Sequence, residues 1–166
     1  MRWMELGIFE PFLRNHSAWN TRPQEPWVFG EPYEGLIREL LLLRSRLLPY
    51  LYSLFEEASR TGAPILRPLL FEFSSDETTY STDDEFLLGS AILVAPIARP
   101  GTEYRHVYIP RGTWVHYWSG EAVTGPAHVL AHAPLGKITA SRAGCGVHRV
   151  QRFSGMSMTM WERASS

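Results

Sequence analysis

The segment RNHSAW, residues 14–19, brings several kinds of side-chain chemistry together. Arg14 supplies a cation, Asn15 an amide, His16 an imidazole and Trp19 an indole. An imidazole can both donate and accept hydrogen bonds, so such a loop is able to hold a polar ligand. A single histidine in a loop is nevertheless more often a surface or structural residue. The other segments of the chain therefore decide between a binding loop and a polar surface.

The acidic residues give no evident catalytic pair. The three aspartates lie in SSDE and TDDEF, and we interpret them as solvated residues or helix caps. The glutamates show no spacing that demands a pair, and the adjacent Glu56 and Glu57 are expected to be solvated on a helix. The other acidic residues considered are Asp76, Asp83, Asp84, Glu5, Glu10, Glu25 and Glu72. The sequence thus predicts no catalytic residue within the chain.

Metal and cofactor motifs are also missing from the sequence. The six histidines are scattered, and His128 and His132 lie in a strand-like region where a shared face at ligand spacing is not expected. There is no Gly-rich phosphate loop and no G-x-S-x-G motif. The single cysteine, Cys145, excludes a disulfide framework within the chain and a Cys-rich zinc site. We therefore expect no metal and no cofactor.

Composition indicates a globular chain without a nucleic-acid or membrane partner. The 166 residues are 45% apolar and 20% charged, which is enough apolar material to bury a core. The formal net charge is -1 and no Lys/Arg block stands out, so nucleic-acid binding has no electrostatic support. Apolar runs such as Leu40 to Leu43 are too short to span a bilayer. The first residues lack the long apolar run and cleavage site of a signal peptide.

The loop has to be positioned by the helical segments on either side of it. Residues 1–12 are expected to form a short helix stopped by Pro11. Residues 13–33 are rich in proline and glycine and are expected to form a long loop that its aromatic residues keep ordered. Residues 34–60 carry an apolar stripe at helical spacing, and Gly62 is a stop signal just past its end. The stripe consists of Leu36, Leu40, Leu47, Leu51, Phe55 and Ala58.

Within the helical segment 34–60, Pro49 predicts a kink in the long helix or a junction of two helices. The chain after this segment has a different pattern. Residues 63–73 are expected to form a buried strand that Pro68 makes irregular. A polar stretch with a helical turn, capped by Ser81 or Thr82, then leads to short strand-like runs separated by Pro/Gly turns. Such runs at roughly ten-residue spacing are typical of a β-sandwich or barrel.

Several of these motifs follow one another as they do in a known family. RWMELGIFEPFLRNH, QEPWVFG, RSRLLPYLYSLFEEASRTGAPILRPLLFEF, DDEFLLGSAILVAPI and VYIPRGTWVHYWSG resemble the C-terminal part of a glycoside hydrolase family 31 α-glucosidase. The resemblance covers about residues 1–138. It implies an α+β composite, in which the last segment of a (β/α)8 TIM barrel is followed by a partial antiparallel β-sandwich. The domains expected from it are the barrel end over 1–78, the incomplete proximal sandwich over 79–150 and a divergent tail over 151–166.

The resemblance also assigns roles to particular residues. In this family His16 of the RNH motif would hydrogen-bond the hydroxyls of a glucose in the reaction pocket, and an imidazole suits hydroxyls because it donates and accepts. Arg14 and Asn15 are expected to brace the loop through salt bridges or backbone hydrogen bonds. Trp19 and Trp27 are expected to plug the barrel loops, with stacking on a sugar as the alternative. A further expectation is that Arg2 and Trp3 are packing residues.

The resemblance implies a retaining α-glucosidase that hydrolyses α-glucosidic bonds in an α-glucoside or oligosaccharide. Retention needs two carboxyl groups, and the family's two catalytic aspartates lie in motifs that precede RNH and do not occur here. An opening that carries Trp3, Phe9 and Phe12 also looks as though it begins within a fold. We therefore expect a fragment that is inactive alone, and the alternative is a non-catalytic module that binds carbohydrate or a partner protein. After residue 138 the family's strand pattern stops, so a frame-shifted or unrelated tail is our hypothesis for residues 139–166.

Overall fold

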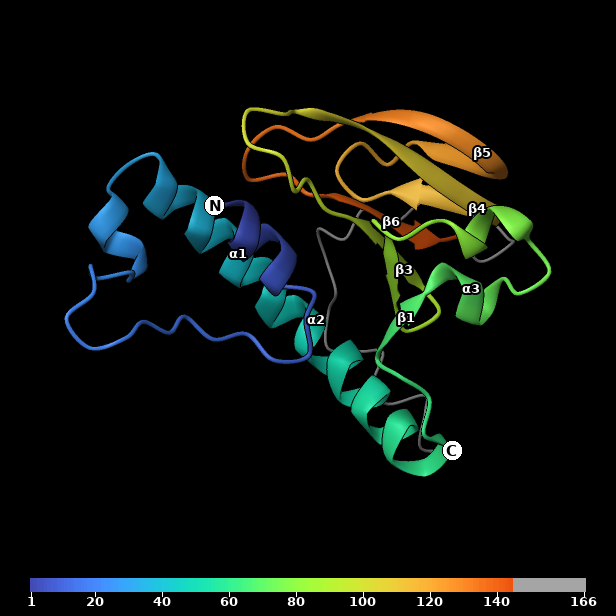
Figure 1. Cartoon of the computed structure of the whole chain (residues 1–166), viewed down its shortest axis with the longest axis horizontal. Helices are drawn as coiled ribbons and strands as arrows, with labels where there is room; N and C mark the ends of the chain where they lie inside the picture. Colours follow the sequence, from blue (N-terminus) through green and yellow to red (C-terminus); the bar gives the residue numbers. More distant parts are fainter. Residues whose placement is uncertain (145–166) are drawn as a thin grey trace.

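The computed structural model describes residues 1–144. Its elements in chain order are α1 (Arg2–Gly7), the 3-10 helix η1 (Pro26–Phe29), α2 (Tyr33–Thr61), β1 (Leu66–Pro68), α3 (Leu69–Glu72), the 3-10 helix η2 (Glu77–Tyr80), β2 (Phe86–Leu88), β3 (Ile92–Ala95), β4 (Tyr104–His116), β5 (Ala122–His132) and β6 (Thr139–Ala143). Figure 1 shows α1 and the long loop after it beside the first half of α2, with the strands gathered on the other side. No helix in residues 1–144 has the length and apolar character needed to cross a membrane.

The long helix α2 forms as its apolar stripe predicts. Its buried residues are Ile37, Leu40, Leu43, Leu51 and Leu54, which recur at helical spacing. Gly62 ends the helix in the left-handed conformation, with φ 75°, and its N–H donates to the carbonyl of Ala58. The predicted helix over 34–60 is confirmed, although Phe55, which we placed on the stripe, is exposed.

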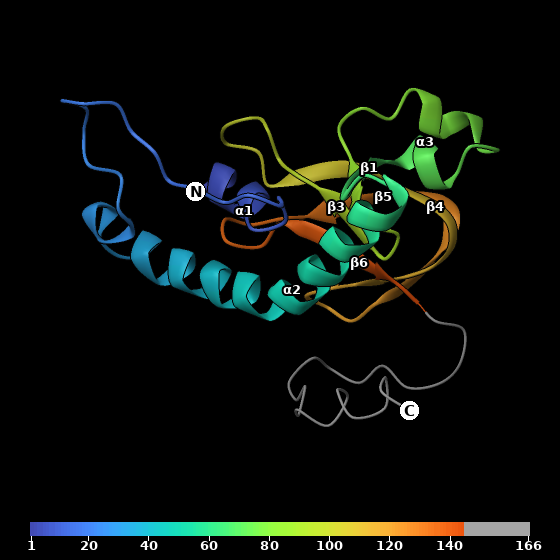
Figure 2. The ribbon, with the colours of Figure 1, turned by 90° about the horizontal axis from the view of Figure 1, so that it is seen from below.

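Pro49 bends this helix without dividing it. The residue lies inside α2, and Figure 2 shows the helix changing direction about midway along its length. Proline has no N–H, so one hydrogen bond of the helical ladder is lost at this position, and its ring crowds the preceding turn. Of the two alternatives from the sequence, the kinked single helix is confirmed.

The six strands form one antiparallel sheet in the order β1-β2-β3-β6-β4-β5. β3 and β4 are consecutive strands along the chain, but β6 lies between them. Arg142 of β6 is paired with Ile92 of β3 and with Val115 of β4. The predicted antiparallel strands are confirmed, while the two-sheet sandwich and the barrel remain predictions, since residues 1–144 contain a single sheet.

Two local predictions differ from the structure. The predicted strand over 63–73 is shorter in the structure, where only Leu66–Pro68 form β1. Pro68 lacks the N–H needed to continue a ladder, and it is the N-cap of the helical turn α3 that follows. The turn η2 is capped by Asp76, whose side chain accepts from the N–H of Thr78 at 3.1 Å. The prediction of a helical turn that Ser81 or Thr82 would cap is wrong, since η2 precedes both residues, their hydroxyls donate to the carbonyl of Thr78, and the strand β2 follows them.

The segment just after residue 138 also forms a strand. Thr139, Ala140 and Ser141 are buried in β6, at the centre of the sheet. Ala140 lies in the apolar cluster beneath α2, where its small side chain is buried. The prediction that the strand pattern stops after 138 is wrong for residues 139–143, whereas the predicted divergent tail over 151–166 lies outside the described residues.

The apolar side chains form two clusters. The first packs the end of α1 and the inner side of α2 against the sheet, through Ile8, Phe9, Leu40, Leu43, Leu51, Leu54, Leu88, Val94, Ile138 and Ala140. The second joins α3 to the sheet and to the β4–β5 ribbon, through Leu69, Leu87, Leu93, Ala95, Val107, Tyr108, Ile109 and Trp114. Neighbouring residues of β2 and β3 alternate between the clusters, as the two-residue period of a strand requires. The β2–β3 part of the sheet is therefore covered on both faces, and α2 is held against one of them.

Candidate functional site

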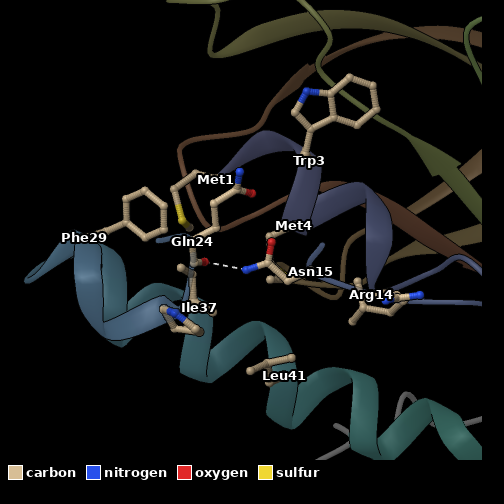
Figure 3. A pocket seen from close by; sticks show the side chains of 11 residues that line it. Met1, Trp3, Met4, Arg14, Asn15, Gln24, Phe29, Ile37 and Leu41 are labelled. Atoms are coloured by element: carbon tan, nitrogen blue, oxygen red, sulfur yellow. Dashed lines mark hydrogen bonds between the residues drawn. The ribbon is translucent and has the colours of Figure 1, made fainter. Parts of the chain in front are cut away.

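A cavity of about 430 Å³ lies between α1, the following loop and the first half of α2 (Figure 3). Its lining residues are Met1, Trp3, Met4, Leu13, Arg14, Asn15, Gln24, Pro26, Phe29, Ile37 and Leu41. Arg14, Asn15 and Gln24 supply polar groups, and most of the others are apolar or aromatic. The RNH motif thus begins at the edge of a concave, largely apolar surface.

His16 directly follows the cavity-lining residues and is exposed. Its Nδ1 lies 3.1 Å from Nη2 of Arg14. A guanidinium can only donate hydrogen bonds, so Nδ1 must accept and a neutral His16 ring carries its proton on Nε2. This arrangement leaves Nε2–H as the donor that the imidazole can present to another molecule.

Asn15 closes the loop upon itself. Its amide nitrogen donates to the carbonyl of Gln24, the contact drawn as a dashed line in Figure 3. The two ends of the segment 15–24 are thereby joined without secondary structure between them. The prediction that Asn15 braces the loop through a backbone hydrogen bond is confirmed, whereas Arg14 contacts the His16 ring and not a carboxylate or the backbone.

The tryptophans of the loop are on its surface. Trp19 is 91% exposed and Trp27 66% exposed, so in residues 1–144 neither ring plugs an interior. Arg22 lies over the ring of Phe29, with its guanidinium carbon 5.8 Å from the ring centroid. The expected plugging and the alternative of stacking on a sugar both remain predictions.

The segment between α1 and the loop is fixed by Arg44 of α2. The guanidinium donates to the carbonyls of Ile8 at 2.9 Å and Pro11 at 3.0 Å, and also to that of Glu10. Burial lowers the pKa of Arg44, and the nearby Glu10 opposes this effect. The sequence analysis missed this residue, although its spacing of four and seven from Leu40 and Leu51 indicates a position on the apolar side of the helix.

A second set of contacts ties α1 to the sheet domain. Arg2 forms an ion pair with the buried Glu5 at 2.8 Å and donates to the carbonyls of Thr102 and Ala133 at 3.0 and 2.8 Å. Glu5 also accepts from the backbone N–H of Gly136 at 2.8 Å. The packing role predicted for Arg2 is confirmed, but the one predicted for Trp3 is not seen, since Trp3 is 84% exposed among the described residues.

The aspartates have the structural roles that the sequence indicated. Asp76 caps η2 and accepts from the hydroxyl of Tyr108. Asp83 is exposed, and the exposed Asp84 forms an ion pair with Arg105 at 2.8 Å. Among the glutamates, Glu57 differs from our expectation, because it pairs with the buried Arg67 at 2.8 Å.

One buried carboxyl group was missed by the sequence analysis. Oε1 of Glu85 accepts from the N–H of Tyr108 at 2.8 Å and lies 3.3 Å from Nη2 of Arg105. Its Oε2 is buried without a hydrogen-bond partner in the described structure. Burial raises the pKa of Glu85 to about 7, against the lowering effects of Tyr108 and Arg105. Nothing in the local sequence marks this burial, since it arises from packing against a strand twenty residues later.

No metal centre is evident in the described part. Within residues 1–144, no group of three or more His, Cys, Asp or Glu side chains is arranged to hold a metal ion. His132 stacks on Tyr104 with ring centroids 4.6 Å apart, and His128 lies against Tyr108 at 5.0 Å. These imidazoles are thus engaged with aromatic rings on the β4–β5 ribbon.

The two halves of the chain match two parts of one enzyme family. Residues 1–54 match the model described as the glycosyl hydrolases family 31 TIM-barrel domain, and residues 62–144 match the glycosyl hydrolase family 31 C-terminal domain. Both matches are to domains of glycoside hydrolases. The chain belongs to glycosyl hydrolase family 31.

Curated relatives agree with this assignment. The chain is 52% identical over 134 residues to Alpha-glucosidase 2 of Bacillus thermoamyloliquefaciens, which covers 81% of this chain and 17% of the relative. It is 39% identical over 162 residues to a probable glucan 1,3-alpha-glucosidase of Arabidopsis thaliana, covering 96% of this chain and 18% of the relative. The chain therefore spans less than a fifth of the length of these relatives.

Solved structures of the family have the same fold over most of the chain. A Flavobacterium johnsoniae GH31 dextranase complexed with glucose superposes with a TM-score of 0.80 at 35% identity, covering 86% of this chain and 18% of that one. A GH31 alpha-xylosidase from a soil metagenome complexed with xylose superposes with a TM-score of 0.79 at 30% identity, covering 86% of this chain and 24% of that one. These relatives act on different sugars, so the family assignment alone does not select a substrate.

Proposed function

We propose that this chain supplies the late barrel segment and the C-terminal domain of a retaining α-glucosidase, with His16 at the edge of its sugar pocket. The observation that carries this proposal is the match of residues 1–54, RNH motif included, to the family's barrel domain. The relative with 52% identity is named an α-glucosidase, which favours an α-glucoside or oligosaccharide as substrate. In barrel enzymes the active site lies in the loops at the carboxyl ends of the strands, and a loop such as 13–33 suits this position.

The catalytic carboxylates of the proposed enzyme lie in barrel segments outside these residues. Retention requires two carboxyl groups about 5–5.5 Å apart, one as nucleophile and one as acid and base. Asp76 is committed to a cap and to Tyr108, Asp84 to Arg105, and Asp83 lies exposed in the connection after the long helix. The isolated chain is accordingly inactive on α-glucosides, because without the nucleophile the covalent route is absent.

His16 binds substrate through the ring nitrogen that Arg14 leaves available. Arg14 donates to Nδ1, so Nε2–H is the group that donates to a sugar hydroxyl. Arg14 thereby selects the tautomer, and Asn15 fixes the backbone next to it through Gln24. The adjoining apolar cavity and the exposed indoles provide surfaces on which the apolar face of a pyranose can lie.

A chimaera tests this role. The aligned segment of this chain replaces its counterpart in the Bacillus Alpha-glucosidase 2, and hydrolysis of 4-nitrophenyl α-glucoside is measured. His16→Ala should lower kcat/KM by about ten-fold to 150-fold, since the lost hydrogen bonds are worth roughly 1.5–3 kcal/mol in the transition state. His16→Gln, which keeps a side-chain donor, should retain more activity than His16→Ala.

The matched control is Asp83→Ala, which removes an exposed carboxylate from the connection after the barrel segment and should leave kcat/KM unchanged. Full activity of His16→Ala, or loss of activity in Asp83→Ala, would overturn the placement of the site. The isolated chain is assayed in parallel. Turnover above the buffer blank that survives His16→Ala would contradict the proposal that the catalytic aspartates lie outside it.

A further inference from the structure

We propose that Arg44 is a positioning residue for the sugar-binding loop, and that it acts on His16 through the backbone of residues 8–11. This inference rests on the proposed function of His16. Arg44 lies on α2, far along the chain from the loop; it is not one of the residues that line the cavity, and its hydrogen bonds go to residues 8–11 and not to His16. Its effect on substrate would therefore be indirect.

The contacts of Arg44 are all with the main chain. Nη1 donates to the carbonyls of Ile8 and Glu10, and Nη2 donates to that of Pro11. Ile8 is the C-cap of α1, where carbonyl groups have no further partners within the helix. One guanidinium thus binds three carbonyls in the segment that directly follows α1 and fixes the direction in which the chain leaves the helix.

The direction of this exit decides where His16 lies. After Pro11 the only residue that is not exposed before the 3-10 helix is Leu13, which packs against the apolar cluster beneath α2. Residues 14–25 are all exposed, and their described side-chain contacts are among themselves or with Phe29. The loop therefore has no strong attachment of its own to the core, and the Arg44 contacts are the nearest polar anchor that precedes His16.

An arginine is required for this geometry. Its planar guanidinium presents several N–H donors in a fixed arrangement, so two nitrogens can reach three carbonyls at once. A lysine ammonium is a single point on a flexible stem and cannot reproduce the fork. Arg44→Lys should therefore loosen residues 8–16 while keeping the positive charge, and Arg44→Met should loosen them further.

Hydrogen exchange of the full 166-residue chain tests the anchor directly. In Arg44→Met we expect amides of residues 8–16 to exchange at least ten-fold faster, with rates in the sheet and in the second half of α2 unchanged. The control is Arg46→Met, which removes an exposed arginine from the same helix. Unchanged exchange in residues 8–16, or an equal increase throughout the chain, would overturn the proposal, and if Arg44→Met does not fold, Arg44→Lys is judged by the same criteria.

A double-mutant cycle in the chimaera tests the link to His16. Arg44→Lys should lower kcat/KM several-fold in the parent and have no further effect when His16 is already alanine, because Arg44 acts through that side chain. Additive losses would show that Arg44 has a general structural role and would overturn the inference. If His16→Ala has no effect, the proposed function fails, and the exchange experiment still decides whether Arg44 anchors the loop.

Discussion

Replacing Glu85 by glutamine should stabilise the chain above neutral pH and leave it unchanged in acid. The carboxyl is buried at 5% exposure, one of its oxygens has no hydrogen-bond partner in the described residues, and its pKa rises from 4.5 to about 7. A raised pKa in the folded state means that the protonated form is preferred there. The stability associated with Glu85 is therefore fully present below pH 4.5 and is lost as pH rises through about 7.

The magnitude follows from the size of the pKa change. A rise from 4.5 to about 7, at about 1.36 kcal/mol for each pKa unit, corresponds to about 3 kcal/mol of unfolding free energy. Glutamine keeps the oxygen that accepts from the N–H of Tyr108 but carries no charge. The two proteins should thus unfold with equal free energies near pH 4.5, and the glutamine variant should be more stable by up to about 3 kcal/mol at pH 8.

Urea unfolding of both proteins between pH 4.5 and 8.5 measures this difference. Other titrating groups are common to both chains, so they cancel in the comparison. Asp84→Asn is the matched control, because it removes the neighbouring exposed carboxylate that shares Arg105 and should change stability little. A glutamine variant that is less stable at pH 8, or a difference that does not change between pH 4.5 and 7, would refute the reasoning.

Two further predictions concern the exposed apolar surface and the β4–β5 ribbon. The chain should bind a fluorescent dye that reports hydrophobic surface and should unfold over a broad temperature range. The reason is that large apolar residues are exposed, among them Trp3, Phe12, Trp19 and Tyr52. A sharp two-state transition above roughly 60 °C in calorimetry would contradict this. Gly125→Ala should lower the unfolding free energy by roughly 1–3 kcal/mol, since its Cβ would clash with the carbonyl oxygen of Pro110, where the pairing of β4 with β5 shifts register between Ile109 and Gly112. Thr124→Ala on the exposed side should have little effect, and equal stability of the two variants in urea unfolding would contradict this prediction.

The long helix could be predicted because its signals are local. Apolar residues at helical spacing and a terminal glycine determine α2 within thirty residues of sequence, and Pro49 marks its bend. The same local reasoning places the loop and its His16. Strand β6 could not be found this way, because Thr, Ala and Ser have no strand pattern and form a strand only where β3 and β4 provide partners on both sides.

The sequence indicated the residues of the candidate loop but not the residues that hold the surrounding structure in place. Asn15 braces the loop as expected, through the hydrogen bond from its amide nitrogen to the carbonyl of Gln24. Arg44 and Glu85 were missed because their partners lie twenty or more residues away along the chain. Such contacts depend on how α1, α2 and β4 pack together, which no short segment of sequence specifies.

The position of β6 has a consequence for the order of events during synthesis. β1, β2 and β3 can pair with one another as they leave the ribosome, and β4 can pair with β5, since each of these contacts joins strands close along the chain. The two groups share no ladder until residues 139–143 arrive between them. Because chains are made from the N-terminus at about 5–20 residues per second, the short stretch from the end of β5 at His132 to the end of β6 at Ala143 leaves two separate sheets with open edges for roughly 0.5–2 s. Until then those edges are free to pair with another nascent chain, which makes this interval the one at which a chaperone has most to protect.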